Sequence, residues 1–321
     1  MQIILHGLGG VATLMLTSIA MAQSNFPAKP VTMVLPFAAG GPVDVEARRH
    51  AAKLTEFLGQ SFLVDFKPGG GDIIATNYVA KSAPDGYTLM VAGSSHTANP
   101  YLYKDLPYDS QKDFAPVSLV SKRGSILLSN LSTLGNNMME LIAYARANPG
   151  KVNWSAVGPL SQLNARWFAA SAGVELTVVN YKSTPQALTD LMAGRLDVGT
   201  FTELIALPLV KAGKVKALGM MAAQRSRIFP GVLPIAEQGV PGYDANNWFG
   251  ILARAGTPAA VVNRLSEGFA KSARSPDVIA ALEAGGVITV GSTPEQLRQM
   301  MAEESERWRM LIQTYNIKVE E

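Results

Sequence analysis

The sequence has 321 residues, of which 48% are apolar and 17% are charged, and its formal net charge is +3. These proportions are typical of a folded globular protein and exclude a disordered or low-complexity chain. Cysteine is absent, which excludes disulfides, a thiol nucleophile and a Cys-ligated metal. Lys and Arg are scattered among Asp and Glu without a basic run, so the sequence predicts no nucleic-acid partner.

The N-terminus carries an apolar run over residues 8–21 that ends beside the tripeptide Ala20-Met21-Ala22. The run is shorter than the ~20 residues that span a bilayer, and Ala-x-Ala is a typical cleavage site. A buried first helix is the alternative, but three glycines within the first ten residues disfavour it. We therefore expect a signal peptide over residues 1–22, cleavage after Ala22 and a periplasmic location, although no Lys or Arg precedes the run.

The rest of the chain alternates short β-rich apolar runs with amphipathic helical stretches, a pattern that indicates α/β layers. A predicted strand over Val31–Phe37 ends in Ala38-Ala39-Gly40-Gly41-Pro42, and a helix with Gly59 just past its end follows. The glycine pair thus lies between a strand and a helix N-terminus, where backbone N–H groups can bind a carboxylate. A plain tight turn explains the same pattern equally well.

A cluster of small polar residues, Gly93-Ser94-Ser95-His96-Thr97, follows the predicted strand Thr88–Ala92. Open α/β sheets bind ligands at the carboxyl ends of their strands, which makes this segment a second candidate for a binding site. A solvated loop made of turn-forming residues has the same composition. The glycine-rich segment Gly69-Gly70-Gly71 lacks the remaining residues of a P-loop or a dinucleotide fingerprint.

The sequence offers few residues for catalysis. Of its three histidines, His96 is the one plausible general base, and in an extended segment the adjacent Ser95 would point the opposite way. The chain contains no Gly-x-Ser-x-Gly, no His-Glu-x-x-His and no cluster typical of metal ligands. We therefore expect no enzyme activity, no metal and no cofactor, and a hydrolase is the less favoured alternative.

Near the C-terminus, Thr293 predicts the start of a long helix. One stripe of that helix would carry Leu297, Met300, Met301, Trp308, Leu311, Ile312 and Tyr315. This stripe indicates packing against a core and not a cofactor site.

Several segments of the chain resemble the Bug family, the receptors of tripartite tricarboxylate transporters. The resemblance covers nearly all of the chain after residue 25, in order. It is carried by Phe26-Pro27-Ala28-Lys29-Pro30-Val31, Pro36-Phe37-Ala38-Ala39-Gly40-Gly41-Pro42-Val43-Asp44, Pro84-Asp85-Gly86-Tyr87-Thr88-Leu89, Lys112-Asp113-Phe114-Ala115-Pro116, Pro241-Gly242-Tyr243 and Ala255-Gly256-Thr257-Pro258.

The resemblance implies an α/β protein with the type II periplasmic-binding-protein fold, in which two α/β lobes joined by two crossing strands enclose a ligand cleft. The first lobe would comprise residues 23–120 and 246–321, and the second residues 121–245. Such a receptor is a monomer that captures a small organic carboxylate by closing its lobes and delivers it to integral membrane transporter subunits. A sensor that presents its closed form to a signalling partner is an alternative that the sequence does not separate.

The resemblance also implies which residues bind the ligand. The first lobe would contribute Phe37, Ala38, Ala39, Gly40, Gly41, Val43, Asp44, Ser94, Ser95, His96 and Thr97, and the second Val157, Gly158, Pro159, Ser161 and Phe201. Val43, Pro159 and Phe201 stand where the family usually has Thr, Ser and Asp, so each removes a hydrogen-bonding side chain. We therefore expect a solute less polar than a tricarboxylate, such as an aromatic or longer-chain monocarboxylate.

Overall fold

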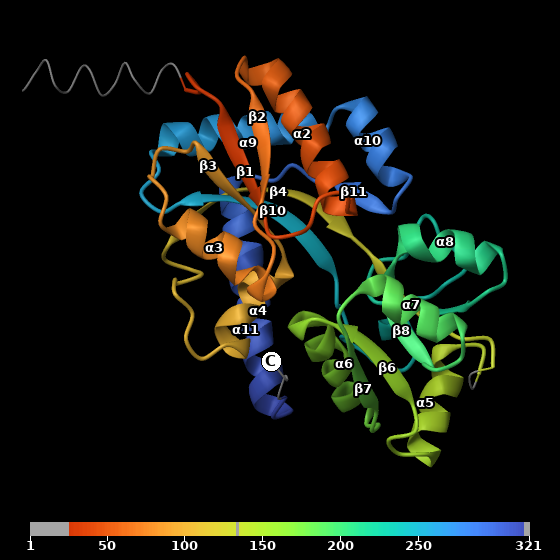
Figure 1. The fold of residues 1–321 in the computed structure, drawn as a ribbon. Coiled ribbons are helices and arrows are strands. Elements are labelled where there is room, and N and C mark those ends of the chain that lie inside the picture. The colour runs from red at the N-terminus through yellow and green to blue at the C-terminus, as the bar shows by residue number, and fades with distance from the viewer. Residues whose placement is uncertain (1–25, 133–134, 318–321) are drawn as a thin grey trace, which may run out of the picture.

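The computed structural model describes residues 26–132 and 135–317, which form two α/β lobes built on separate β-sheets (Figure 1). The two-lobed α/β architecture predicted from the sequence is thereby confirmed. The predicted signal peptide and its cleavage site after Ala22 lie outside the described residues. Within the described ranges, no helix combines the length and the apolarity that a membrane span requires.

The sheet of the first lobe has the strand order β11-β4-β10-β3-β1-β2. Its strands are β1 (Val31–Leu35), β2 (Phe62–Phe66), β3 (Thr88–Ala92), β4 (Phe114–Arg123), β10 (Asn247–Arg254) and β11 (Val287–Thr289). Strands β2, β1 and β3 are parallel, whereas β10 runs antiparallel to both β3 and β4. Because β1, β2 and β3 are parallel, their carboxyl ends meet at one edge of the sheet.

The sheet of the second lobe has the strand order β7-β6-β8-β5-β9. Its strands are β5 (Ser125–Ser129), β6 (Asn153–Val157), β7 (Thr177–Tyr181), β8 (Val198–Thr202) and β9 (Lys216–Met220). Strands β7, β6 and β8 are parallel, and β5 pairs antiparallel with β8 and β9. The second lobe thus repeats the arrangement of the first, with an antiparallel strand inserted where the chain enters.

Helices cover both sheets. The first lobe contains α2 (Pro42–Leu58), α3 (Ile73–Ala80), α4 (Ser94–Leu102), α9 (Ala259–Ala273), α10 (Pro276–Glu283), α11 (Pro294–Thr314) and the short 3₁₀ helix η1 (Gly70–Asp72). The second contains α5 (Met138–Ala147), α6 (Pro159–Ala172), α7 (Thr184–Met192), α8 (Glu203–Lys211) and the 3₁₀ helix η2 (Ile235–Glu237). The predictions for α2 were correct, since Pro42 opens it and Gly59, with φ of 74°, ends it.

The chain passes between the lobes along β4 and β10 (Figure 1). Gly124 alone separates the last residue of β4 from the first residue of β5. A Cβ atom at Gly124 would meet the carboxylate of Glu203, so any other residue at this link would displace that side chain. We propose that the chain passes from one lobe to the other at Gly124 and at Asn246–Asn247, close to the boundaries expected from the sequence.

The C-terminal helix α11 joins the two lobes. Its N-terminus lies at Thr293, as predicted, and carries a capping box in which the Thr293 side chain accepts from the Gln296 N–H. Leu297 packs in the first lobe, whereas Trp308 packs in the second lobe's core, edge-on to Trp167 with ring centroids 5.8 Å apart. The predicted stripe was wrong at its end, because Tyr315 follows the helix and is 40% exposed.

Candidate functional site

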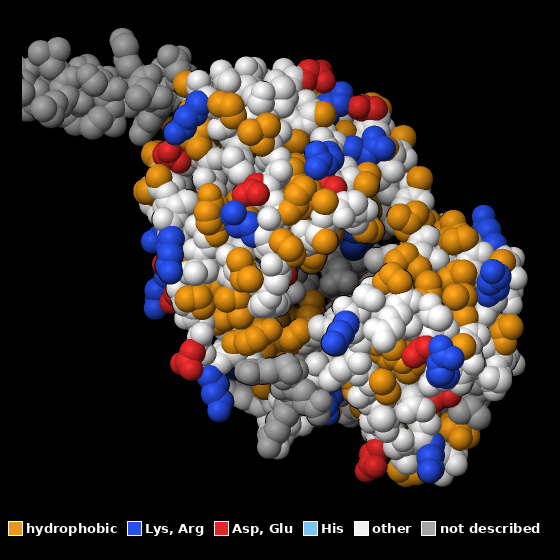
Figure 2. Space-filling model, viewed as in Figure 1, with side chains coloured by type: hydrophobic (Ala, Val, Ile, Leu, Met, Phe, Trp, Pro, Cys, Tyr) orange, Lys and Arg blue, Asp and Glu red, His pale blue; other side chains and the backbone are white. Residues whose placement is uncertain are grey.

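A cavity of about 420 Å³ lies between the two lobes. The molecular surface is visibly hollowed there (Figure 2). A volume of this size is typical of a site for a small molecule. Both lobes supply its walls, which consist of Phe37, Pro42, Val43, Gly93, Ser94, Ser95, Arg123, Trp248, Phe249, Ser125, Ser155, Val157, Leu160, Ser161, Asn164, Thr184, Ala187, Thr200, Phe201, Thr202, Ile205 and Asn247.

Helix N-termini converge on this cavity. Among the described residues, five helices begin at its wall, where the first-turn or cap residues are Pro42 and Val43 of α2, Ser94 and Ser95 of α4, Leu160 and Ser161 of α6, Thr184 of α7 and Thr202 before α8. Each helix start leaves backbone N–H groups without an intrahelical acceptor and carries a partial positive charge. Together these ends create an environment that favours an anion.

The walls between the helix starts are largely apolar. Phe37 and Phe249 meet edge-on, with ring centroids 5.9 Å apart. Trp248 lies next to Phe249 on strand β10 and also lines the cavity. From the second lobe, Leu160 and Phe201 face the cavity. Within the described ranges, no three His, Asp or Glu side chains are grouped so that they could hold a metal ion. The cavity therefore suits an organic anion with an apolar body.

The first glycine loop closes on itself. The Gly40 N–H donates to Asp44 Oδ2 at 2.8 Å, and the buried Asp44 carboxylate also accepts from Arg48 Nε at 2.6 Å. Phe37, Pro42 and Val43, at the two ends of this loop, line the cavity, whereas residues 38–41 between them form the turn. Asp44 thus shapes the loop from behind, and the backbone N–H of Gly40 is already paired within the protein.

The prediction that Ser94 to Thr97 form a loop was wrong, because helix α4 begins at Ser94 immediately after the N-cap Gly93. Ser, His, Thr and Asn are weak helix formers, so the helix depends on tertiary contacts that the local sequence does not show. Ser94 and Ser95 line the inter-lobe cavity. The hydroxyl of Ser94 also donates to the carbonyl of Asn246 at 3.3 Å, which links α4 to the second crossing segment.

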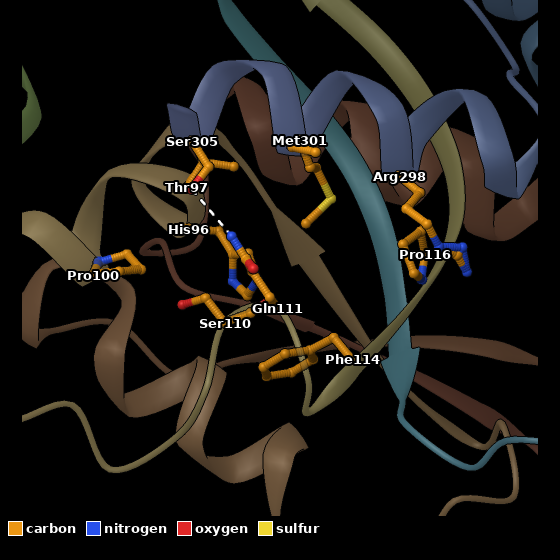
Figure 3. A pocket seen from close by; sticks show the side chains of 11 residues that line it. His96, Thr97, Pro100, Ser110, Gln111, Phe114, Pro116, Arg298, Met301 and Ser305 are labelled. Atoms are coloured by element: carbon orange, nitrogen blue, oxygen red, sulfur yellow. Dashed lines mark hydrogen bonds between the residues drawn. The ribbon is translucent and has the colours of Figure 1, made fainter. Parts of the chain in front are cut away.

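His96 and Thr97 lie on the other side of α4 and line a separate cavity of about 250 Å³, next to α11 (Figure 3). His96 Nε2 lies 3.0 Å from the carbonyl oxygen of Ser110, and burial lowers the His96 pKa to about 4. The imidazole is therefore neutral and donates through Nε2 at neutral pH. Since Ser95 and His96 line different cavities, they do not form a nucleophile–base pair.

A buried carboxylate holds α4 in place. Glu304 of α11 accepts hydrogen bonds from Thr97 Oγ1 at 2.5 Å and from Trp248 Nε1 at 2.7 Å. Burial raises the pKa of Glu304, and these donors together with nearby Arg307 favour its ionised form. Because Trp248 lines the inter-lobe cavity, Glu304 positions two parts of the cavity wall from behind.

A second buried carboxylate, Asp72, lies beside Ser95. Asp72 precedes α3 with φ of 76°, a left-handed conformation that Asp and Asn tolerate better than most side chains. Burial raises its pKa to about 6, and the hydrogen bond with Ser95 opposes this shift. Asp72 is thus the hydrogen-bond partner of the Ser95 hydroxyl, and Ser95 lines the cavity.

In the second lobe, Gly158 and Pro159 form the start of α6. Gly158 is the N-cap with φ of 81° and ψ of 170°, a conformation available to glycine, and Pro159 fits the first helical turn. Val157 and Ser161, on either side of them, line the cavity. Phe201 is 3% exposed and belongs to the second lobe's core as well as to the cavity wall. The Phe201 side chain therefore packs in the core and also borders the cavity.

Sequence reasoning missed several residues of the cavity wall. Trp248 and Phe249 follow the Asn246–Asn247 pair where the chain returns to the first lobe, and this change from polar to aromatic residues was the available signal. Arg123 ends β4 and also lines the cavity, but nothing in the sequence separates it from the other scattered basic residues. Thr184 and Thr200 face the same space from α7 and β8.

Comparison with known proteins identifies the family. A profile described as the tripartite tricarboxylate transporter family receptor matches residues 46–317. The chain belongs to this receptor family. The receptor is also similar to the protein BugT of Bordetella pertussis, with 32% identity over 303 residues that cover 93% of each chain.

Solved structures of similar sequence share the receptor's fold. The structure of R. palustris Rpa4515 with adipate has a TM-score of 0.81 at 33% identity, covering 91% of the receptor and 99% of that chain. The structure of MatC from Rhodopseudomonas palustris with bound malate has a TM-score of 0.78 at 31% identity, covering 89% and 100%. These matches confirm the periplasmic-binding-protein fold and the Bug-family resemblance expected from the sequence.

Proposed function

We propose that the protein is a periplasmic receptor that captures a small organic acid between its lobes and delivers it to a membrane transporter. The observation that carries this proposal is the convergence of five helix N-termini, among the described residues, on one inter-lobe cavity. Free N–H groups and helix dipoles stabilise a carboxylate there without a charged partner at each helix.

The ligand's remaining surface would contact the apolar walls formed by Phe37, Phe201, Trp248 and Phe249. Burial of apolar surface contributes affinity, and the helix starts fix the orientation of the acid group. The related receptors solved with adipate and with malate support an organic acid as the ligand class.

Capture would depend on closure, because each lobe carries part of the site. Ser95 and Val43 belong to the first lobe, whereas Ser161 and Thr184 belong to the second. A ligand that contacts both sets stabilises the closed arrangement over any open one. The short link at Gly124 would localise this movement to β4 and β10.

Export would follow from cleavage after Ala22, and N-terminal sequencing of periplasmic material should begin at Gln23. Intact Met1 in a soluble cytosolic fraction would overturn this location. The proposed transporter partner rests on family membership.

Binding is tested by a thermal unfolding screen against mono-, di- and tricarboxylates, with amines and sugars as controls. An acid present at about 100 times its dissociation constant should stabilise the folded protein by about 2.7 kcal/mol. Stabilisation by sugars or amines and by no acid would refute the proposal.

Delivery is tested by deleting the gene and measuring uptake of the acid identified in the screen. A receptor for a transporter predicts loss of uptake that is restored by the wild-type gene. Normal uptake together with loss of an acid-dependent transcriptional response would instead identify a sensor.

A further inference from the structure

Arg123 differs from every other residue of the inter-lobe cavity in carrying a charge, as far as the described residues show. It is the last residue of β4, directly before the Gly124 link, and its side chain is 8% exposed. A cation is costly to bury unless its N–H groups meet acceptors. Its partners therefore decide whether its role is purely structural.

The protein itself satisfies only part of this guanidinium. Nη2 donates to the buried carboxylate of Glu46, which also accepts from the Ser121 hydroxyl. The guanidinium carbon lies 4.5 Å from the ring centroid of Phe249, another residue of the cavity wall. The buried Nε has no hydrogen-bond partner among the described residues. A guanidinium offers five N–H donors, so donors remain beyond the bond to Glu46, and the side chain that carries them borders the cavity.

We propose that Arg123 determines specificity by pairing with a second acidic group of the ligand. This inference rests on the proposed function, in which the helix N-termini hold the first carboxylate. Guanidinium and carboxylate groups match in shape and can form two parallel hydrogen bonds. Glu46 fixes the Arg123 side chain and offsets its charge. The pair therefore increases the affinity for an acceptor at a defined position more than it increases the affinity for anions in general.

The pairing changes the ligand expected from the sequence. Val43, Pro159 and Phe201 favour a solute of low polarity, and Val43 and Phe201 do line the cavity. The apolar surface they share with Phe37 and Trp248 suits a methylene chain between two carboxylates. Arg123 thus selects a chain-like diacid over the monoacid of equal length.

The test measures affinities by titration calorimetry for diacid and monoacid pairs of equal chain length: succinate and butanoate, glutarate and pentanoate, adipate and hexanoate. We expect the wild type to prefer the best diacid over its monoacid by about 10- to 100-fold, the range of one hydrogen bond to a charged group. The double variant Glu46→Met with Arg123→Met removes the buried pair together, so no charge is left without a partner.

This double variant should lose the preference for the diacid, because its affinity for the diacid falls by more than its affinity for the monoacid. Glu46→Gln keeps Arg123 and an oxygen acceptor for its Nη2, so it should retain the preference, with a lower unfolding free energy because the guanidinium loses its counter-charge. Arg123→Lys should retain part of the preference. A double variant that keeps the wild-type preference, or a wild type that prefers the monoacid, overturns the inference but leaves acid binding intact. Binding of no acid by the wild type instead refutes the proposed function itself.

Discussion

Replacement of Asp72 by Asn should reveal the free energy stored in a buried charge beside the cavity. Burial raises the pKa of this carboxyl from 3.8 to about 6. The folded protein therefore binds the proton more tightly than the unfolded chain does. Stability from this group is greatest below pH about 4 and is lost as the pH rises through about 6. The whole shift corresponds to about 3 kcal/mol of unfolding free energy at neutral pH.

Asn cannot ionise, and it tolerates the left-handed conformation that Asp72 adopts with φ of 76°. The free energy of unfolding of Asp72→Asn, relative to wild type, should therefore be larger at pH 8 than at pH 5 by about 1.4 kcal/mol. Between these pH values the folded carboxyl loses its proton, whereas the unfolded one is already ionised at both.

Urea unfolding of both proteins at pH 5 and pH 8, followed by tryptophan fluorescence, measures this difference. Asp109→Asn is the control, because hydrogen bonds led by the Lys112 N–H lower the pKa of Asp109, and its titration lies below both pH values. Its effect on stability should be the same at pH 5 and pH 8. An equal effect of Asp72→Asn at the two pH values would refute the assigned pKa and its cause.

Two further substitutions test the proposed binding site. Gly41→Val should weaken ligand binding with little loss of stability, because Gly41 has φ of −79° and a new Cβ would approach no atom closer than Ala38 O at 3.7 Å. The control is Gly59→Val, far from the cavity, where the left-handed conformation with φ of 74° is strained for valine; it should lower stability and leave ligand affinity unchanged. Wild-type affinity in Gly41→Val would exclude the loop from the site. Phe201→Asp should both lower the unfolding free energy, by about 3–5 kcal/mol or more, and weaken binding, since it buries an unpaired charge in the core and the cavity wall. Calorimetry and urea unfolding of that variant separate the effects, and full affinity in a destabilised protein would limit Phe201 to the core.

The parts of the fold that sequence reasoning predicted correctly are those that local chemistry determines. Examples are the strand at Thr88–Ala92, the start of α2 at Pro42 and the start of α11 after Thr293, each of which has a signal within a few residues. Both lobes follow from the alternation of strands and helices and from the family resemblance. These features need no knowledge of distant parts of the chain.

The parts that it missed depend on contacts between distant residues. Helix α4 forms from poor helix formers because Thr97 bonds to Glu304, and Asn99 Nδ2 donates to the carbonyl of Gly71 at 2.7 Å. The same contacts turn His96 and Thr97 away from the inter-lobe cavity. That these two residues bind the ligand stays a prediction. Arg123 reaches the cavity wall because β4 crosses between the lobes at that residue. No local pattern in the sequence marks that crossing.

The contact between Trp167 and Trp308 makes the receptor's intrinsic fluorescence sensitive to its conformation. Trp167 lies on α6 of the second lobe, and Trp308 lies where the first lobe's α11 reaches into the second lobe's core, so their excited states are coupled only while α11 rests against α6. Trp248 lies in the cavity wall, where its emission depends on what touches the ring. Since the chain has four tryptophans, single replacements of Trp167 and Trp248 by Phe can divide the signal between lobe movement and occupancy. Opening and filling can thus be timed separately, without an attached dye.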